Sequence, residues 1–250
     1  MTMTTVTKQD IVKALAELGV KPGDLLEVHS SLSSFGHVEG GAAAVVEALM
    51  EAVTEEGTLY MPALRLSPAL ELNEQDKALG LTSKIRILPP DAPRTAMGVI
   101  ADTFRQMPGV VVGDGVFRTA AWGRHAETAK THGLGYLLQN GGHALMMGVD
   151  IYKLTAMHYM EDVLPARVSA VFAPPKEALE VYPESEWLIE AGQPPILGWY
   201  TIQVRAYEQG LITDAYVGSS KWMYFRADLV TGLYRKALLE EGCALYGLEP

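Results

Sequence analysis

Apolar residues along the first quarter of the chain recur with two different periodicities, one typical of helices and one typical of strands. The pattern predicts, in order, a helix, a strand, a second helix and a second strand, at residues 7–19, 25–29, 40–53 and 57–64. At the start of the first helix, Thr7 and Asp10 fit a capping box in which Asp replaces the usual Glu or Gln. The order strand, helix, strand, with a polar loop leading into the helix, predicts a βαβ unit.

The remainder of the chain continues the mixture of helix and strand patterns. Residues 65–95 have weak periodicity and many polar positions, so we expect a long surface excursion of the kind that often covers a site. Helices are predicted at 97–107, 155–164 and 226–242, and strands at 110–112, 119–123 and 143–149. Residues 167–217 mix β-type runs with Pro and Gly, which predicts a small antiparallel β portion. No repeat or linker divides the chain, so residues 1–250 are expected to form one α/β domain.

Composition narrows the possible classes of protein. The chain has 250 residues, 48% of them apolar, and a mean hydropathy of +0.09, which is enough to build a hydrophobic core. A net charge of −10 and a pI near 5.1 argue against a general nucleic-acid binder. We find neither an apolar run of about 18 residues nor a signal peptide, and one cysteine excludes an internal disulfide framework. A cytoplasmic protein that binds no membrane is therefore expected.

Several familiar catalytic motifs are absent from the sequence. The chain has no nucleophile elbow, no phosphate-binding P-loop and no zinc-protease His-Glu motif. The six histidines show no spacing that favours a metal site, so no metal is expected.

The segment "VHSSLSSFGHVEGG" follows a predicted strand and precedes a predicted helix. Its small side chains and accessible backbone N–H groups suit a loop that cradles a phosphate or an amide chain, although an ordinary flexible βα loop has the same composition. His29 ends the strand. Its ring nitrogens are either satisfied by backbone, or the side chain belongs to a site at the carboxyl end of the sheet.

The stretch "LTAMHYMEDV" places His158 and Glu161 three residues apart, on one face of a helix. One interpretation is a helix rim that meets solvent. Another is a general base with an orienting carboxylate, and a third is a metal-dependent hydrolase, which fits this pair but not the rest of the chain.

Six segments occur in an order that carries a family resemblance: "KPGDLLEVHSSLSSFGHVEGGAAAVVEALMEAV", "EGTLYMP", "MGVIADTFRQMPGV", "AAWG", "GGHALMMGV" and "TAMHYMEDV". Together they resemble the aminoglycoside 3-N-acetyltransferase family, the antibiotic N-acetyltransferases. The resemblance implies a single domain of that type, which is distinct from the GNAT acetyltransferases. It has a mixed central sheet, flanking helices and a small antiparallel β portion. The likeness covers roughly residues 7–165 and weakens towards residue 230.

The resemblance also implies an activity and its residues. It implies acetyl-CoA as donor and a cationic small-molecule amine as acceptor, with transfer to an aminoglycoside amino group at the 3-N position and hence antibiotic resistance. His158 would be the general base and Glu161 the carboxylate that orients it. The coenzyme would be held by the Ser- and Gly-rich loop, the strand end and the start of a later helix: His29, Ser30, Ser31, Leu32, Ser33, Phe35, Gly36, Val38, Gly40, Gly41, Met97 and Gly98.

Acceptor contacts are expected from Asp114, Arg118, Tyr152, Thr155 and Asp162. The carboxylates would meet ammonium groups. Trp122, Tyr152 and Trp222 would wall a sugar site, unless they are buried by packing, which is the commoner fate of such aromatics.

One segment departs from the family pattern. The family carries a basic-Ser-x-His-Pro-x-x-Ser run before "AAWG", whereas this chain has Asp114-Gly115 in place of His-Pro and Arg118 in place of the later serine. The departure keeps three functions open: transfer to an aminoglycoside, the same chemistry on another amine, and a coenzyme-binding homologue that has lost activity. Either a monomer or a homodimer is compatible with the sequence.

Overall fold

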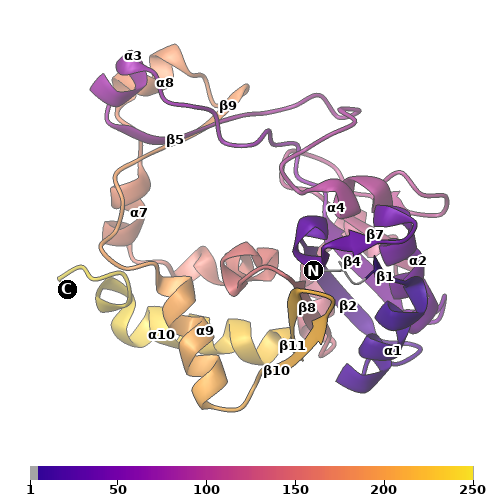
Figure 1. Cartoon of the computed structure of the whole chain (residues 1–250). Helices are drawn as coiled ribbons and strands as arrows, with labels where there is room; N and C mark the ends of the chain where they lie inside the picture. The colour runs from indigo at the N-terminus through magenta and orange to yellow at the C-terminus, as the bar shows by residue number, and fades with distance from the viewer. Residues whose placement is uncertain (1–4, 250) are drawn as a thin grey trace.

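The structure is a computed structural model that describes residues 5–249 (Figure 1). Within these residues the central element is a seven-stranded sheet with the strand order β10-β11-β8-β2-β4-β7-β6. The strands, in that order, are Thr213–Val217, Ser220–Arg226, His143–Met147, Leu25–Ser30, Thr58–Pro62, Thr119–Gly123 and Val111–Val112.

The sheet is mixed. Strand β2 pairs in parallel with β8 and β4, while the flanking strands β11, β10, β7 and β6 are all antiparallel to their neighbours. Two small sheets accompany it: a parallel pair, β1 (Thr5–Val6) with β3 (His37–Val38), and an antiparallel pair, β5 (Leu81–Arg86) with β9 (Trp187–Ala191). The predicted mixed central sheet is confirmed.

Helices cover both faces of the sheet, which is expected when central strands are parallel. One core is formed with α1 (Lys8–Leu18), α2 (Gly41–Val53) and α4 (Val99–Phe104). The opposite core is formed with the helical segments α5 (Thr128–Thr131), α6 (Leu134–Gln139), η2 (Ile151–Lys153), η3 (Thr155–Val163), α7 (Ala166–Phe172), α9 (Gly198–Glu208) and α10 (Ala227–Leu245). Within residues 5–249, none of the helices combines the length and apolar character that crossing a membrane requires.

The first helix begins and ends as the sequence predicts. The Thr7 side chain accepts from the Asp10 N–H at 3.2 Å, and the Asp10 carboxylate accepts from the Thr7 N–H at 2.8 Å, so the capping box is present. Gly19 ends the helix in the left-handed region with a φ of 94°.

The excursion at residues 65–95 and the segment 167–217 are more ordered than predicted. Strands β5 and β9 pair across the chain and, with α3 (Glu74–Ala78) and α8 (Lys176–Val181), enclose a small hydrophobic cluster of their own around Leu81, Ala178 and Ile189. We call this unit the satellite lobe; it stands apart from the main sheet, at the far end of α7 (Figure 1). The prediction of an antiparallel β portion was right for β9 and β10 but wrong for α7, α8 and α9.

The stretch predicted as a helix at 155–164 is a 3₁₀-helix, η3, over Thr155–Val163. A run of nine residues is long for this conformation, which seldom exceeds three or four. Its three-residue turn stacks residues i and i+3 directly, so the predicted shared face of His158 and Glu161 is retained.

Candidate active site

His158 and Glu161 form a hydrogen-bonded pair on η3. The Nδ1–H of His158 donates to Oε2 of Glu161 at 2.7 Å. The imidazole is 61% exposed, while the carboxylate is 28% exposed. A neutral ring that donates from Nδ1 has its lone pair on Nε2. Glu161 therefore fixes the tautomer of the His158 ring, and the basic nitrogen Nε2 is presented to solvent.

The start of η3 is anchored to the end of β2. Its residues Ala156 and Met157 are buried. The backbone N–H of Thr155 points to Nε2 of His29, and that of Ala156 donates to Oε1 of Glu27, each at 3.2 Å. His29 thus contacts backbone at Thr155, which precedes His158 by one 3₁₀ turn; the prediction that His29 belongs to a site stays a prediction.

The Ser- and Gly-rich loop folds into the 3₁₀-helix η1 (Leu32–Phe35). The hydroxyls of Ser31 and Ser33 lie 3.0 Å apart on its exposed side, and Ser34 Oγ donates to the Ser31 carbonyl at 2.7 Å. The loop packs closely on Gly148, where a Cβ would come within 1.9 Å of Ser34 Oγ. Glycine at 148 therefore permits the loop to lie against the end of β8.

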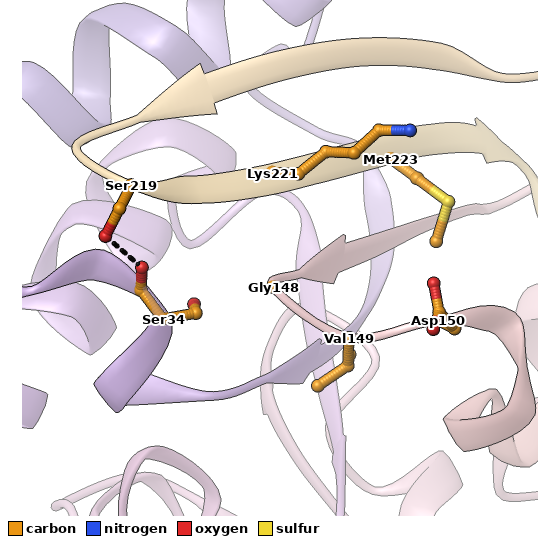
Figure 2. A pocket seen from close by; sticks show the side chains of 7 residues that line it. All are labelled: Ser34, Gly148, Val149, Asp150, Ser219, Lys221 and Met223. Atoms are coloured by element: carbon orange, nitrogen blue, oxygen red, sulfur yellow. Dashed lines mark hydrogen bonds between the residues drawn. The ribbon is translucent and has the colours of Figure 1, made fainter.

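A hollow of about 270 Å³ opens beside this loop. Figure 2 shows Ser34 and Ser219 on one side of it, where the Ser219 hydroxyl donates to the Ser34 carbonyl at 2.6 Å. Lys221 lies on the other side and is paired with Asp214 at 2.9 Å. The remaining lining residues are Gly148, Val149, Asp150 and Met223.

Met97 and Gly98 meet the same edge of the sheet. A Cβ on Gly98 would lie 3.9 Å from the Ser30 carbonyl oxygen, so the start of α4 adjoins the end of β2. The buried carboxylate of Asp102 fixes the approach to this point by accepting from the Thr95 N–H at 2.8 Å. The structure therefore brings together the strand end, the loop and the helix start that the sequence assigns to the coenzyme.

Three of the residues considered for the two binding sites have buried side chains. The side chains of Phe35 and Val38 are buried in the core, so the prediction that they hold the coenzyme is confined to their backbone atoms. Trp222 is also fully buried, packed edge-on against Phe35 with ring centroids 5.7 Å apart. It is a core residue and not a wall of a sugar site.

Two charged residues predicted to meet the acceptor already have protein partners. Arg118 donates to the carbonyls of Ala63 at 3.0 Å and Pro90 at 2.7 Å, tying the end of β4 to the loop before α4. Asp162 is paired with Arg235 on α10, which lowers the pKa of its carboxyl. Asp114, by contrast, is exposed in the β6–β7 turn.

A group of aromatic residues lies beside His158, and Tyr152 is the one that the sequence predicts as a site residue. Tyr152 stacks on Tyr200 with centroids 5.4 Å apart and planes at 10°, and both rings are exposed. Trp199 lies between this stack and the base, 6.0 Å from Tyr152 and 4.8 Å from the His158 ring. Trp199 and Tyr200 are not among the predicted site residues, because no helix is predicted at α9; the apolar spacing of "GWYTIQVRAYE" is the signal that the sequence offers.

Glu190 of the satellite lobe is a second residue that the sequence did not reveal. Desolvation raises the pKa of its carboxyl, nearby His158 lowers it, and Glu161 raises it. The Glu190 charge in turn contributes to the raised pKa of Tyr152, after burial, which is the larger cause. The Glu190 carboxyl is therefore coupled electrostatically to His158 and Glu161.

No group of three or more His, Cys, Asp or Glu side chains suited to a metal ion occurs within residues 5–249.

Comparison with known sequences places these features in a family. The family model for aminoglycoside 3-N-acetyltransferase matches residues 28–188. An aminoglycoside N(3′)-acetyltransferase-like protein, YokD, of Bacillus subtilis is 35% identical over 179 residues, covering 64% of this chain and 66% of that protein. An aminoglycoside N(3)-acetyltransferase III from Salmonella is 36% identical over 180 residues, covering 63% and 60%. The matched part of the chain thus spans less than two thirds of these relatives' length.

Solved structures share the fold over a longer span. The apoenzyme of aminoglycoside acetyltransferase AAC(3)-IVa aligns with a TM-score of 0.71 at 22% identity, over 100% of this chain and 94% of that one. A binary complex of AAC-IIIb with CoASH aligns with a TM-score of 0.67 at 19% identity, over 94% and 97%. Because the matched family model spans more than half of the chain, including the Ser- and Gly-rich loop and η3, the chain belongs to the aminoglycoside 3-N-acetyltransferase family.

Proposed function

We propose that the protein is an acetyl-CoA-dependent N-acetyltransferase that acts on an amino group of an aminoglycoside, at the 3-N position by family membership. The observation that carries the proposal is the His158–Glu161 pair. Its exposed imidazole stands at the carboxyl end of the sheet, one helical turn from the contact between η3 and the β2 end.

The first chemical task belongs to His158. An ammonium group has no lone pair, so the acceptor must lose a proton before it can attack a thioester carbonyl. Nε2 of His158 takes that proton, and the carboxylate of Glu161, bonded to Nδ1–H, stabilises the imidazolium that results. The amine nitrogen then forms the C–N bond as the C–S bond breaks, and the imidazolium gives its proton to the departing thiolate. The freed imidazole takes the second proton from the acylated nitrogen, which becomes a neutral amide.

The second task is to hold the donor. Acetyl-CoA supplies the acetyl group as a thioester. The hydroxyls of Ser31 and Ser33, the glycine at 36 and the Gly98 helix start form a polar edge with little side-chain bulk, which fits an extended amide chain. A protein with this fold has been solved with CoASH, which supports the assignment.

The third task is to bind a cationic acceptor. Proteins with this fold have been solved with gentamicin and with sisomicin. In this chain the Glu190 and Glu161 carboxylates supply negative charge beside His158, and the Tyr152–Tyr200 stack supplies a flat apolar surface. Carboxylates and aromatic faces both favour the ammonium groups that such an acceptor would carry.

Another amine acceptor is the second candidate, because the 112–119 turn differs from the family pattern. Arg118 anchors backbone there, whereas a serine would leave the segment freer. In either case we propose one acetyltransferase domain over residues 1–250, acting where acetyl-CoA is available, in the cytoplasm.

The test is thiol release from acetyl-CoA with a panel of aminoglycosides and simple amines, for the wild type and His158→Ala. We expect release with an aminoglycoside, lowered by about 10²–10⁴-fold in the variant. Release only with other amines would favour the second candidate. Intact coenzyme binding without release for any acceptor would identify a homologue that has lost activity.

A further inference from the structure

Glu27 is a carboxylate in the middle of the central strand β2. It is fully buried, and its neighbours across the sheet are Tyr60 on β4 and Ala144 on β8. Leu26 and Val28, on either side, are buried in the core of the opposite face. An apolar side chain would pack at this position as its neighbours do, so the fold by itself does not call for a carboxylate.

The hydrogen bonds of Glu27 are incomplete. Oε1 is joined to Nε2 of His29 at 2.8 Å and accepts from the Ala156 N–H at 3.2 Å. Oε2 is buried and has no hydrogen-bond partner among the described residues. Buried polar atoms without partners are rare and destabilising, and they cluster where a function requires them. Glu27 therefore carries a stability cost at a position next to the proposed base.

The Nε2 atom of His29 lies within reach of two groups, the Glu27 carboxylate and the Thr155 N–H. One ring nitrogen either donates or accepts, so it cannot serve both at once. The contact with Glu27 is the shorter, 2.8 Å against 3.2 Å, and it involves a carboxylate, which makes it the stronger bond. Glu27 thus forms hydrogen bonds with both the His29 ring and the Ala156 N–H.

These contacts act on one short piece of backbone. The first N–H groups of a helix have no partner within the helix. At the start of η3 the N–H of Ala156 is taken by Glu27, and the N–H of Thr155 faces the ring that Glu27 holds. His158 follows Thr155 by one 3₁₀ turn. The rotation and depth of that turn set where the imidazole stands relative to the loop at Ser31.

We infer that Glu27 is a positioning residue which, together with His29, fixes the first turn of η3 and so holds His158 at the end of β2. The inference rests on the proposed function, because it concerns the placement of the proposed base. It assigns to Glu27 a role in rate and not in fold stability.

A role in reaction rate and a role in fold stability predict different behaviour in Glu27→Met. The methionine removes the buried carboxylate and fills a similar volume, but it leaves the Ala156 N–H and the His29 ring without their acceptor. These two effects on the free energy of unfolding oppose each other, so Tm should change little. The first turn of η3 loses an acceptor, so kcat should fall by about tenfold to a hundredfold, while KM for both substrates stays within about twofold. Glu27→Gln keeps an oxygen for the Ala156 N–H and should recover most of kcat.

Val28→Thr is the matched control. Position 28 is buried on the same strand but faces the opposite core. The added hydroxyl should lower Tm without changing kcat per folded molecule. A kcat for Glu27→Met equal to that of the wild type would overturn the inference. So would a parallel loss of Tm and kcat in both Glu27 variants, which marks a structural residue.

A readout that needs no turnover separates this inference from the proposed function. Amide hydrogen exchange at Ala156 should be slow in the wild type and in Val28→Thr, and faster in Glu27→Met. If the wild type transfers no acetyl group but this amide responds, the proposed function fails while the positioning contact stands. Unchanged exchange in Glu27→Met overturns the inference whatever the activity.

Discussion

The rings of His158 and Trp199 meet edge to face, with centroids 4.8 Å apart and planes at 65°. Trp199 also contacts Tyr234 on α10, at 6.1 Å and 75°. A helix outside the family match thus supports the proposed base, because the matched region ends at residue 188.

Replacing Trp199 should therefore slow the reaction. Trp199→Leu removes an aromatic contact of the kind worth about 0.5–1.5 kcal/mol, so we expect kcat to fall by about two- to tenfold, with Trp199→Phe between. Steady-state kinetics with the preferred acceptor would measure this. Trp122→Leu is the control, since it changes an indole on strand β7 that packs against the other core. An equal loss in both would show a general effect of packing.

Glu161 should act only through His158. Glu161→Gln weakens the hold on the imidazolium, and we expect kcat to fall by at least about tenfold. Adding Glu161→Gln to His158→Ala should cause no further loss, because residues that act as a unit are not additive. A clear additional loss in the double variant would mean that Glu161 contacts the acceptor directly.

Glu190 should distinguish acceptors by charge. In Glu190→Gln we expect KM for a polycationic aminoglycoside to rise by about fivefold, equivalent to about 1 kcal/mol, while KM for a monoamine changes little. The rise should shrink at high salt, because screening already weakens the wild-type contact. Glu186→Gln, which changes an exposed carboxylate of the same lobe paired with Arg86, should leave both KM values unchanged.

The satellite lobe should loosen in acid. Burial raises the pKa of Asp76, but hydrogen bonds from Lys84, Tyr182 and the Asn73 N–H outweigh it and hold the pKa below its usual range. A carboxyl with a lowered folded-state pKa stabilises the fold above its unfolded pKa of about 3.9, and that stabilisation is lost as pH falls through the folded value. Limited proteolysis between about pH 6 and about pH 3 should show cleavage in the lobe rising at the acid end.

Asp76→Asn provides the comparison. It should make the lobe sensitive to protease already at neutral pH and remove the dependence below about pH 4. Identical acid profiles for wild type and variant would contradict this account.

The elements that sequence could predict are those with local signals. Thr7 and Gly19 mark the ends of α1, and the apolar run at 25–29 marks β2. The sequence could not distinguish a 3₁₀-helix from an α-helix at η3. Periods of 3.0 and 3.6 residues per turn both place His158 and Glu161 on one face over so few residues.

The missed site residues depend on contacts between distant segments. Glu190 lies on β9, whose partner β5 belongs to a distant part of the chain, and the short strands of that lobe have no pattern that identifies their partners. Glu27 left a visible signal, a charged residue inside the apolar run "LLEVH", but its role follows only from the contact with Ala156.

The satellite lobe has its own small hydrophobic cluster, separate from the two cores that hold His158 and the Ser- and Gly-rich loop. Mutations confined to this cluster should leave the packing of those two cores unchanged. On the proposed function, changes in this one unit would alter which amines are accepted, and laboratory selection for new amine substrates should enrich changes around Glu190 before any near His158.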